Sequence, residues 1–175
     1  MPGVEVKLGD GGELLSRGSN TMRGYWRNEE ATRTAIDREG WLHTGDVAEI
    51  RESRIYIRGR MKDILVMSNG EKLPPQDVEF ALLHDPLFEQ VMLVGEGRPF
   101  LTLLAVTQEG NENTLLARAN QRLKDFPRWV RVRRCIATRD PWSIENGLLT
   151  PTLKLKRPLV LAKFKDALDA VYAAG

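Results

Sequence analysis

The sequence predicts a mixed α+β protein in which a strand-rich segment precedes a small C-terminal domain with a short β-sheet and packed helices. After residue 60, strand-like and helix-like patterns alternate over a domain-sized stretch. Before residue 60, short strands and turn signals dominate, and this part is too short to hold a core of its own. The hydrophobic fraction of 42% is that of a globular chain and not of a disordered one.

Short strands account for most of the first 59 residues. Apolar and polar residues alternate over 4–8, and the glycine-rich turn 9–12 predicts a hairpin with a second strand at 13–17. Asn28 precedes acidic residues and therefore predicts the N-cap of a short helix. Two further strands are expected at 47–50 and 55–57.

Strands and helices alternate in the rest of the chain. A strand is expected at 64–67, and Pro74 and Pro75 suit the first turn of a helix because proline lacks the amide hydrogen that is unpaired there. The remaining expected elements are strands at 90–94, 101–106 and 133–138, and helices at 113–124 and 158–173. The change in pattern predicts two domains, residues 1–59 and residues 60–175.

The composition excludes several classes of function. A net charge of +2 gives little support for nucleic-acid binding, which usually requires a concentrated basic face. The single cysteine excludes an internal disulfide and a multi-cysteine zinc site, and His43 and His84 lack a metal-ligand spacing, so no metal site is expected. No apolar run could span a bilayer and no signal pattern is present, so we expect a cytoplasmic protein with at most peripheral membrane contact.

Several conspicuous residues have simple structural interpretations. We expect His43 to be structural and Cys135 to be a small buried hydrophobe in a strand. The basic run 128–134 alternates in a way that fits a strand with one solvated face, and a basic binder of membranes or nucleic acids is the competing hypothesis. The four tryptophans are expected to pack rather than to form ligand platforms: Trp26, Trp41, Trp129 and Trp142.

Three segments carry side chains suited to phosphates, hydroxyls or carboxylates. The Thr-Gly-Asp tripeptide ending at Asp46 presents a carboxylate that can accept hydrogen bonds from ribose hydroxyls, with an ordinary turn aspartate as the alternative. Arg60 follows glycine at a strand end and can offer its donors to a phosphate, with a solvated charge cluster as the alternative. The loop 146–157 delivers lysines that can neutralise growing negative charge, with a polar linker as the alternative.

The order and spacing of the segments are more specific than each segment alone. They read Gly-Trp-Leu-His-Thr-Gly-Asp at 40–46, Tyr-Ile-Arg-Gly-Arg-Met-Lys-Asp-Ile-Leu-Val at 56–66 and Asn-Gly-Glu-Lys-Leu-Pro-Pro-Gln-Asp-Val-Glu at 69–79. This series closely resembles the adenylate-forming (AMP-binding) superfamily of acyl-CoA synthetases, luciferases and peptide-synthetase adenylation domains. The segments 2–7, 12–14 and 22–26 match the stretch that precedes these motifs in that family. Thr-Pro-Thr-Leu-Lys-Leu-Lys-Arg at 150–157 is similar to the lysine loop of the long-chain fatty acyl-CoA synthetase branch.

The resemblance implies an acid–thiol ligase that converts a fatty acid and ATP to an acyl-adenylate and then to acyl-CoA, with Mg²⁺ and coenzyme A also required. By resemblance, Asp46 holds the ribose hydroxyls and Arg60 contacts the nucleotide near the ribose and phosphate. Lys62 stands at the hinge position about which the C-terminal domain swings between the half-reactions. Lys154 matches the lysine that bridges the carboxylate and the α-phosphate.

The resemblance also assigns one loop to the channel for the pantetheine arm of coenzyme A, namely Ser68, Asn69, Gly70, Glu71 and Lys72. The chain departs from the family pattern at Leu153, where glycine is usual, and Lys156 is therefore the alternative catalytic lysine. The Ser/Thr/Gly-rich loop that grips the triphosphate is absent, which implies that a large N-terminal domain is missing and that this chain alone is inactive.

Two alternatives keep the same fold. The chain could be a non-catalytic binding or regulatory module, or part of an adenylation enzyme that acts on another carboxylate. The presence of Asp46, Arg60 and the lysine loop favours a catalytic role. The acyl chain length is not encoded here, because the acyl tunnel of this family belongs to the large domain.

Overall fold

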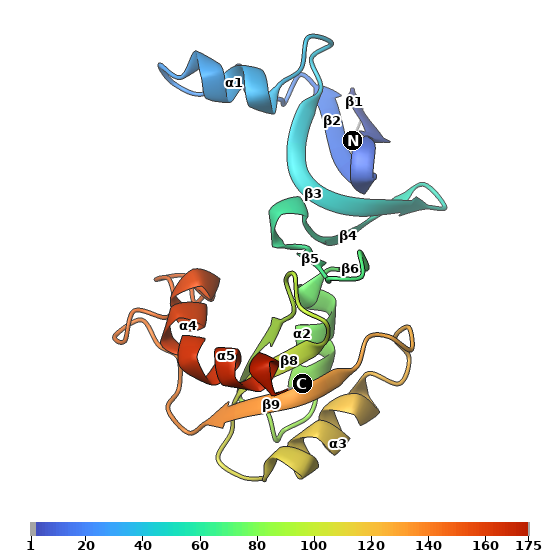
Figure 1. The fold of residues 1–175 in the computed structure, drawn as a ribbon. Coiled ribbons are helices and arrows are strands. Elements are labelled where there is room, and N and C mark those ends of the chain that lie inside the picture. Colours follow the sequence, from blue (N-terminus) through green and yellow to red (C-terminus); the bar gives the residue numbers. More distant parts are fainter. Residues whose placement is uncertain (1–2, 175) are drawn as a thin grey trace. The chain divides into compact units, whose positions relative to one another are not determined.

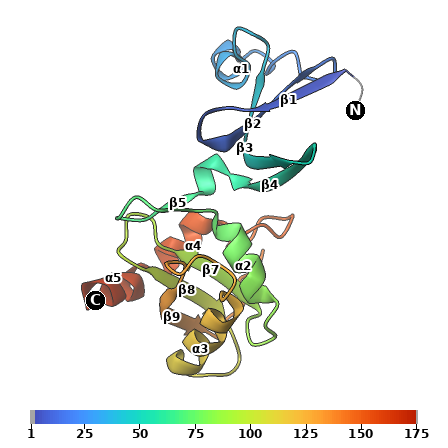
Figure 2. The same cartoon turned by 90° about the vertical axis from the view of Figure 1, so that its right-hand side faces the viewer.

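The computed structural model describes residues 3–174, which form two compact units that meet between Ile64 and Leu65. Figure 1 and Figure 2 show both units. The mixed α+β class expected from the sequence is confirmed. Met1, Pro2 and Gly175 lie outside the described residues, so the proline of the family-like opening segment is not described. Our assignment of the first segment to a larger domain stays a prediction.

Unit 1 is a four-stranded antiparallel sheet with the strand order β1-β2-β3-β4. Its elements are β1 (Val4–Leu8), η1 (Asp10–Gly12), β2 (Glu13–Gly18), α1 (Glu29–Ala35), β3 (Leu42–Arg51), β4 (Arg54–Arg60) and η2 (Met61–Asp63). The predicted hairpin and helix cap are confirmed, since the side chain of Asn28 accepts a hydrogen bond from the backbone N–H of Ala31 at 2.9 Å. β3 starts earlier than predicted, so the Thr-Gly-Asp tripeptide lies within the strand and not in front of it.

Unit 2 contains a three-stranded sheet of order β7-β8-β9 and a two-stranded hairpin of β5 and β6. Its elements are β5 (Leu65–Val66), β6 (Lys72–Leu73), α2 (Pro75–Leu83), β7 (Gln90–Val94), β8 (Leu101–Val106), α3 (Glu112–Arg122), β9 (Val132–Thr138), α4 (Arg157–Lys163) and α5 (Lys165–Ala173). β7 pairs with β8 antiparallel, whereas β8 and β9 are parallel because α3 carries the chain back between them. The sequence predicted β7 and β8 with these bounds but not the parallel pairing.

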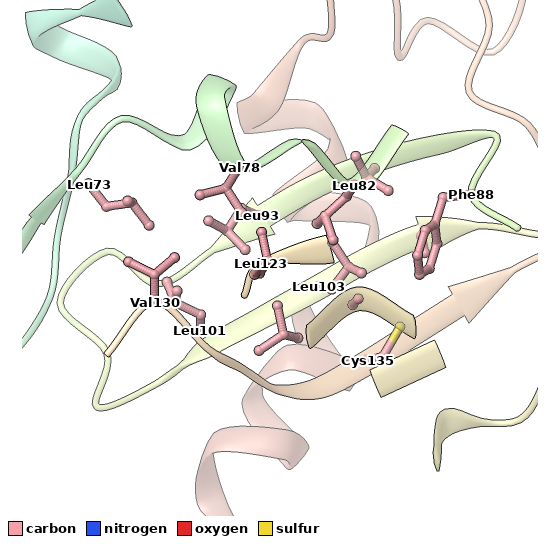
Figure 3. Packing of buried hydrophobic residues seen from close by; sticks show 14 of the residues in the cluster. Leu73, Val78, Leu82, Phe88, Leu93, Leu101, Leu103, Leu123, Val130 and Cys135 are labelled. Carbon is pink, nitrogen blue, oxygen red and sulfur yellow. The ribbon is translucent and has the colours of Figure 1, made fainter. Parts of the chain in front are cut away.

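The core of unit 2 has two layers of side chains, one on each face of the β7-β8-β9 sheet. Residues of α2 and α3, such as Val78 and Leu115, pack against one face, and Figure 3 shows this cluster around Leu93 and Leu103. Residues of α4, α5 and the preceding loop cover the other face. β8 is buried along its whole length, which explains its uninterrupted apolar sequence.

Two expectations about apolar residues are wrong. The helix predicted over 158–173 is broken at Phe164, whose φ and ψ of −100° and 12° separate α4 from α5. The break lets α5 turn so that the hydroxyl of Tyr172 donates to the carbonyls of Val94 and Phe100. Trp26 does not pack, because 87% of its surface is exposed. Trp41 and Trp142 are buried as expected.

The structure also tests the expectations for the strand at 64–67, for Cys135 and for the basic run 128–134. The predicted strand 64–67 is reduced to the two residues of β5. Cys135 lies buried in β9 as expected. In the basic run, residues 128–131 precede β9, and only the part from Val132 on is a strand, with Val132 buried and Arg133 exposed, so the predicted strand is confirmed in part. None of the helices within residues 3–174 has the length and hydropathy that crossing a membrane requires.

Candidate functional site

Asp46 and Arg60 are brought together by the pairing of β3 with β4. The two residues are direct cross-strand partners at the end of the ladder. Their side chains form an ion pair with 2.8 Å between Arg60 Nε and Asp46 Oδ1. More than half of the arginine side chain and about a quarter of the carboxylate are exposed. An exposed pair of this kind contributes at most about 1 kcal/mol, so both groups can exchange this contact for a polar ligand at little cost.

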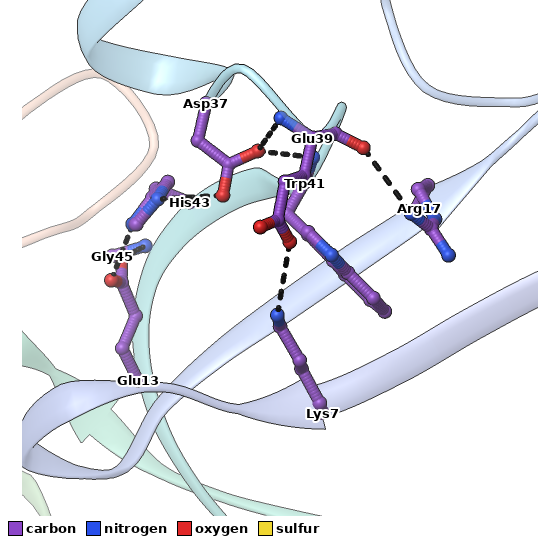
Figure 4. Close-up of polar contacts among 8 residues, drawn as sticks. All are labelled: Lys7, Glu13, Arg17, Asp37, Glu39, Trp41, His43 and Gly45. Carbon is purple, nitrogen blue, oxygen red and sulfur yellow. Dashed lines mark hydrogen bonds and ion pairs between the residues drawn. The ribbon is translucent and has the colours of Figure 1, made fainter.

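The backbone just before Asp46 is held by a glutamate from the neighbouring strand. Gly45 has a φ of 70°, a left-handed conformation that favours glycine, although no atom would obstruct a Cβ there. Glu13 Oε1 accepts the N–H of Gly45 at 2.9 Å, and Glu13 Oε2 lies 2.8 Å from Nδ1 of His43 (Figure 4). Thr44 Oγ1 donates to the carbonyl of Leu14 at 2.7 Å and accepts the N–H of Asp46 at 3.1 Å. These four contacts fix the direction in which the Asp46 carboxylate leaves β3.

The turn before β3 is fixed by a second carboxylate. Asp37 Oδ1 accepts the backbone N–H groups of Glu39 and Trp41, both at 2.9 Å, and the bond from Trp41 is the main reason why the pKa of Asp37 lies below its usual value (Figure 4). Two cations lie over the indole ring of Trp41, with Lys7 Nζ at 4.3 Å and the Arg17 guanidinium carbon at 4.5 Å from the ring centroid. The turn therefore anchors the start of the strand that carries Asp46.

Lys62 and the predicted channel loop have well-defined local structures. Lys62 is exposed in η2, shortly before the boundary of the two units. The loop 68–72 is the exposed turn of the β5–β6 hairpin, closed by the bond from the N–H of Met67 to the carbonyl of Glu71 at 2.8 Å. Gly70 has a φ of 84°, and nothing lies within 4 Å of the position that a Cβ would occupy. The backbone at Gly70 is therefore unobstructed, and a role of this loop in a pantetheine channel stays a prediction.

The lysine loop contains a turn that is closed by hydrogen bonds. The N–H of Thr150 donates to the carbonyl of Lys154 at 2.8 Å, and the N–H of Lys154 donates to Thr150 Oγ1 at 3.0 Å. Leu153 has a φ of 59°, which is rare for a residue with a side chain, and 70% of its surface is exposed. Lys154 is the residue that closes this turn, and its side chain is exposed. Lys156 lies at the N-cap of α4, where its carbonyl accepts the N–H of Leu159 at 2.9 Å.

Other reactive groups give no further candidate. Burial in the core raises the pKa of the Cys135 thiol to about 12, so it is no nucleophile near neutral pH. Within residues 3–174, no group of three or more His, Cys, Asp or Glu side chains could hold a metal ion.

Sequence reasoning did not recognise the supporting role of Glu13. Its position in the strand next to β3, opposite the Thr-Gly-Asp tripeptide, is the signal that could have identified it.

Comparison with known proteins identifies the family. Residues 62–175 match the family model described as the AMP-binding enzyme C-terminal domain. The chain belongs to this family. The resemblance inferred from the motifs is therefore confirmed.

The chain is similar over nearly its whole length to long-chain fatty acid ligases. A long-chain-fatty-acid–[acyl-carrier-protein] ligase of Arabidopsis thaliana is 30% identical to it over 99% of this chain and 28% of its own length. A long-chain-fatty-acid–CoA ligase of Mycobacterium tuberculosis is 31% identical over 98% of this chain and 33% of its own length. The chain thus spans about a third of the length of these relatives.

A solved structure shares the fold. The A domain of carboxylic acid reductase from Segniliparus rugosus, solved in complex with AMP and a co-purified carboxylic acid, has a TM-score of 0.88 and 27% identity. The match covers 99% of this chain and 32% of that one. The AMP-binding neighbour and the ligase relatives agree on the adenylate-forming family.

Proposed function

We propose that this chain is the C-terminal part of an ATP-dependent long-chain fatty acid–CoA ligase and that it requires a large N-terminal domain for activity. In the complete enzyme, a carboxylate oxygen attacks the α-phosphorus of ATP and pyrophosphate leaves. The thiol of coenzyme A then attacks the acyl carbon and AMP leaves. The ligase relatives support this assignment, as does the short share of their length that the chain spans.

In this proposal the Asp46–Arg60 pair binds the nucleotide. The carboxylate of Asp46 accepts hydrogen bonds from the two ribose hydroxyls, and the guanidinium of Arg60 donates to the ribose or the α-phosphate. Their separation of 2.8 Å supports this role, because one ribose phosphate can contact both groups at once. The network of Glu13 and Thr44 behind Asp46 keeps the carboxylate aimed without a reorganisation cost at binding.

The conformation of Leu153 is the observation that carries the catalytic assignment. This residue stands where the family pattern has glycine, and its left-handed backbone is the conformation that glycine adopts most readily. The turn therefore keeps the glycine-like geometry despite the substitution, which supports Lys154 over Lys156 as the bridging lysine. The ammonium lowers the repulsion between the fatty acid carboxylate and the α-phosphate as they approach.

The remaining roles follow from the same proposal. Lys62 acts as the hinge residue, and the open turn 68–72 lines the pantetheine channel after the swing. Mg²⁺ accompanies the triphosphate, and the groups that hold it come from the phosphates and the large domain. A cytoplasmic location is proposed from the single unpaired cysteine.

A second candidate is adenylation of another carboxylate or transfer to another thiol. The similarity to the carboxylic acid reductase domain favours the first variation, and the acyl-carrier-protein ligase among the relatives favours the second. The roles of Asp46, Arg60 and Lys154 are the same in each case, because these groups act on the nucleotide and the carboxylate.

The test joins this chain to the large domain of a long-chain fatty acid ligase and measures ATP–pyrophosphate exchange that depends on the fatty acid. We expect Lys154→Ala to lower the exchange rate by about 10²–10³-fold and Lys156→Ala to leave it within a few-fold. The reverse pattern would keep the family and move the catalytic lysine. Full exchange in both variants would contradict the catalytic proposal.

A further inference from the structure

Arg157 lies three residues after Lys154, at the first position of α4, and ties the base of the lysine loop to two other elements. Arg157 Nη1 donates to Glu79 Oε2 of α2 at 3.0 Å, and Nη2 lies 2.9 Å from Glu79 Oε1. Nη2 also donates to the backbone carbonyl of Leu93 in β7 at 2.9 Å. The two terminal nitrogens of the guanidinium therefore bind the Glu79 carboxylate together, and Nη2 also binds the backbone of β7. The single ammonium nitrogen of lysine cannot reproduce this geometry.

The carboxylate of Glu79 also binds the backbone at the edge of the β7-β8-β9 sheet. β7 is an edge strand, and Glu79 Oε1 accepts the N–H of Leu93 at 2.7 Å while Arg157 binds its carbonyl. The two side chains thus occupy the backbone groups of Leu93 as a further strand would. Only 22% of the Arg157 side chain and 12% of the Glu79 side chain are exposed, so water weakens this pair less than the surface pairs.

The loop that Arg157 holds has a conformation that needs support. The left-handed backbone of Leu153 is strained, and such strain persists only where the surroundings fix it. On its N-terminal side, the Thr150 hydroxyl binds the N–H of Lys154. On its C-terminal side, Arg157 is the side chain that fastens the chain to the sheet. A change far from the reacting atoms that displaces a catalytic group by about 1 Å can lower the reaction rate by about 10²-fold.

We infer that Arg157 and Glu79 are positioning residues that hold Lys154 in place for the adenylation half-reaction; this inference rests on the proposed function. Neither residue is assigned contact with substrate. Because Lys154 acts when the carboxylate meets ATP and not when the thiol attacks, loosening the clamp slows the first half-reaction alone. A pair that only stabilised the fold would affect both half-reactions together.

The experiment uses this chain joined to the large domain of a long-chain fatty acid ligase, with three measurements on each variant. These are fatty-acid-dependent ATP–pyrophosphate exchange, acyl-CoA formation from supplied acyl-adenylate, and the melting temperature. Arg157→Lys keeps the charge and removes the fork, whereas Glu79→Gln keeps an acceptor for Leu93 and removes the ion pair. Arg131→Lys, at an exposed arginine, is the matched control.

We expect Arg157→Lys and Glu79→Gln to lower exchange at least tenfold and to leave acyl-CoA formation from the adenylate within twofold. Added to Lys154→Ala, neither change should lower exchange further, because residues that act as a unit are not additive. Equal losses in both half-reactions in both variants, or full additivity with Lys154→Ala, would overturn the inference. If Lys154→Ala abolishes exchange and the clamp variants do not, the clamp alone fails. If Lys154→Ala itself has no effect, the assignment of Lys154 and the clamp both fail, and the proposed function fails as well if Lys156→Ala also has no effect.

Discussion

The two units of this chain differ in how they are held together. Unit 2 buries a cluster of apolar side chains on each face of its sheet, whereas the only buried apolar residues described in unit 1 are Leu15, Trp41 and Ala48. Unit 1 is held instead by the pairing of its four strands, and its ion pairs, such as those of Glu49, are exposed to solvent. The comparison indicates that the predicted nucleotide contacts, Asp46 and Arg60, lie in a unit with few buried apolar residues, whereas the predicted catalytic lysine, Lys154, lies in a unit with a large apolar core.

The largest expected effect is a difference in cooperative unfolding between the two units when each is produced as a separate fragment. A fragment of residues 65–175 should melt cooperatively and keep a near-ultraviolet circular dichroism signal, because it contains both clusters. A fragment of residues 1–64 should show no cooperative transition, because it is small and buries few apolar residues. Thermal unfolding of each fragment checks this, and cooperative melting of residues 1–64 would break the comparison.

The next effect concerns a buried carboxylate of unit 2 and its half-exposed arginine partner. Asp85 is 2% exposed and accepts two hydrogen bonds from Arg118, at 2.8 and 2.6 Å. We expect Asp85→Asn to lower the free energy of unfolding by about 2 kcal/mol, because the buried amide replaces charge-assisted hydrogen bonds and turns one of its two acceptors into a donor. Asp140→Asn, at an exposed aspartate, is the control and should change it by less than about 0.5 kcal/mol. Urea titration of the whole chain measures both.

The pH dependence of the same pair has a definite sign. The hydrogen bonds from Arg118 hold the pKa of Asp85 below its usual value in the folded protein. Its stabilisation is therefore complete above the unfolded-state pKa of about 4 and is lost as the pH falls through the lower folded-state pKa. The stability difference between wild type and Asp85→Asn should shrink at acid pH, and a difference that grows there would contradict this account.

A smaller effect tests the strain in the lysine loop. We expect Leu153→Gly to raise the free energy of unfolding by about 0.5–1 kcal/mol, since glycine adopts the left-handed conformation freely and its greater freedom in the unfolded chain offsets only part of the gain. Leu153→Ala keeps the strained Cβ and should bring no gain. Equal effects of the two changes in a urea titration would show that backbone strain is not the cause.

The smallest effect is expected in unit 1. Arg51 and Arg58 lower the pKa of Glu49 to about 2, yet all three side chains are exposed to solvent to a large extent. Because solvent screens such pairs, Glu49→Gln should leave the melting temperature of the whole chain unchanged. A measurable fall would mean that exposed ion pairs do stabilise this unit.

The elements with strong local signals were the predictable part of the fold. The cap at Asn28 and the bounds of β7 and β8 follow from local residue patterns. The parallel pairing of β8 with β9 and the break at Phe164 depend on contacts distant in sequence, such as those of Tyr172 with Val94 and Phe100, and local patterns do not contain them.

The sequence proposed residues for the candidate site but not their geometry. The motifs proposed Asp46, Arg60 and Lys154, whereas the pairing of the first two depends on the register of β3 and β4, which includes a bulge after Val47. The contacts that Glu13 and Arg157 make were not predicted, because their partners come from other elements. Their roles depend on tertiary contacts and not on any local pattern.

The central claim is that this chain supplies the lysine and a nucleotide contact to a larger adenylate-forming ligase. The most direct measurement mixes the chain with the separately produced large domain of a long-chain fatty acid ligase and assays ATP-dependent acyl-CoA formation. We predict product from the mixture, none from either part alone, and about 10²–10³-fold slower formation when the chain carries Lys154→Ala. No product from a mixture whose parts are folded and shown to bind each other, or undiminished product with Lys154→Ala, would contradict the account.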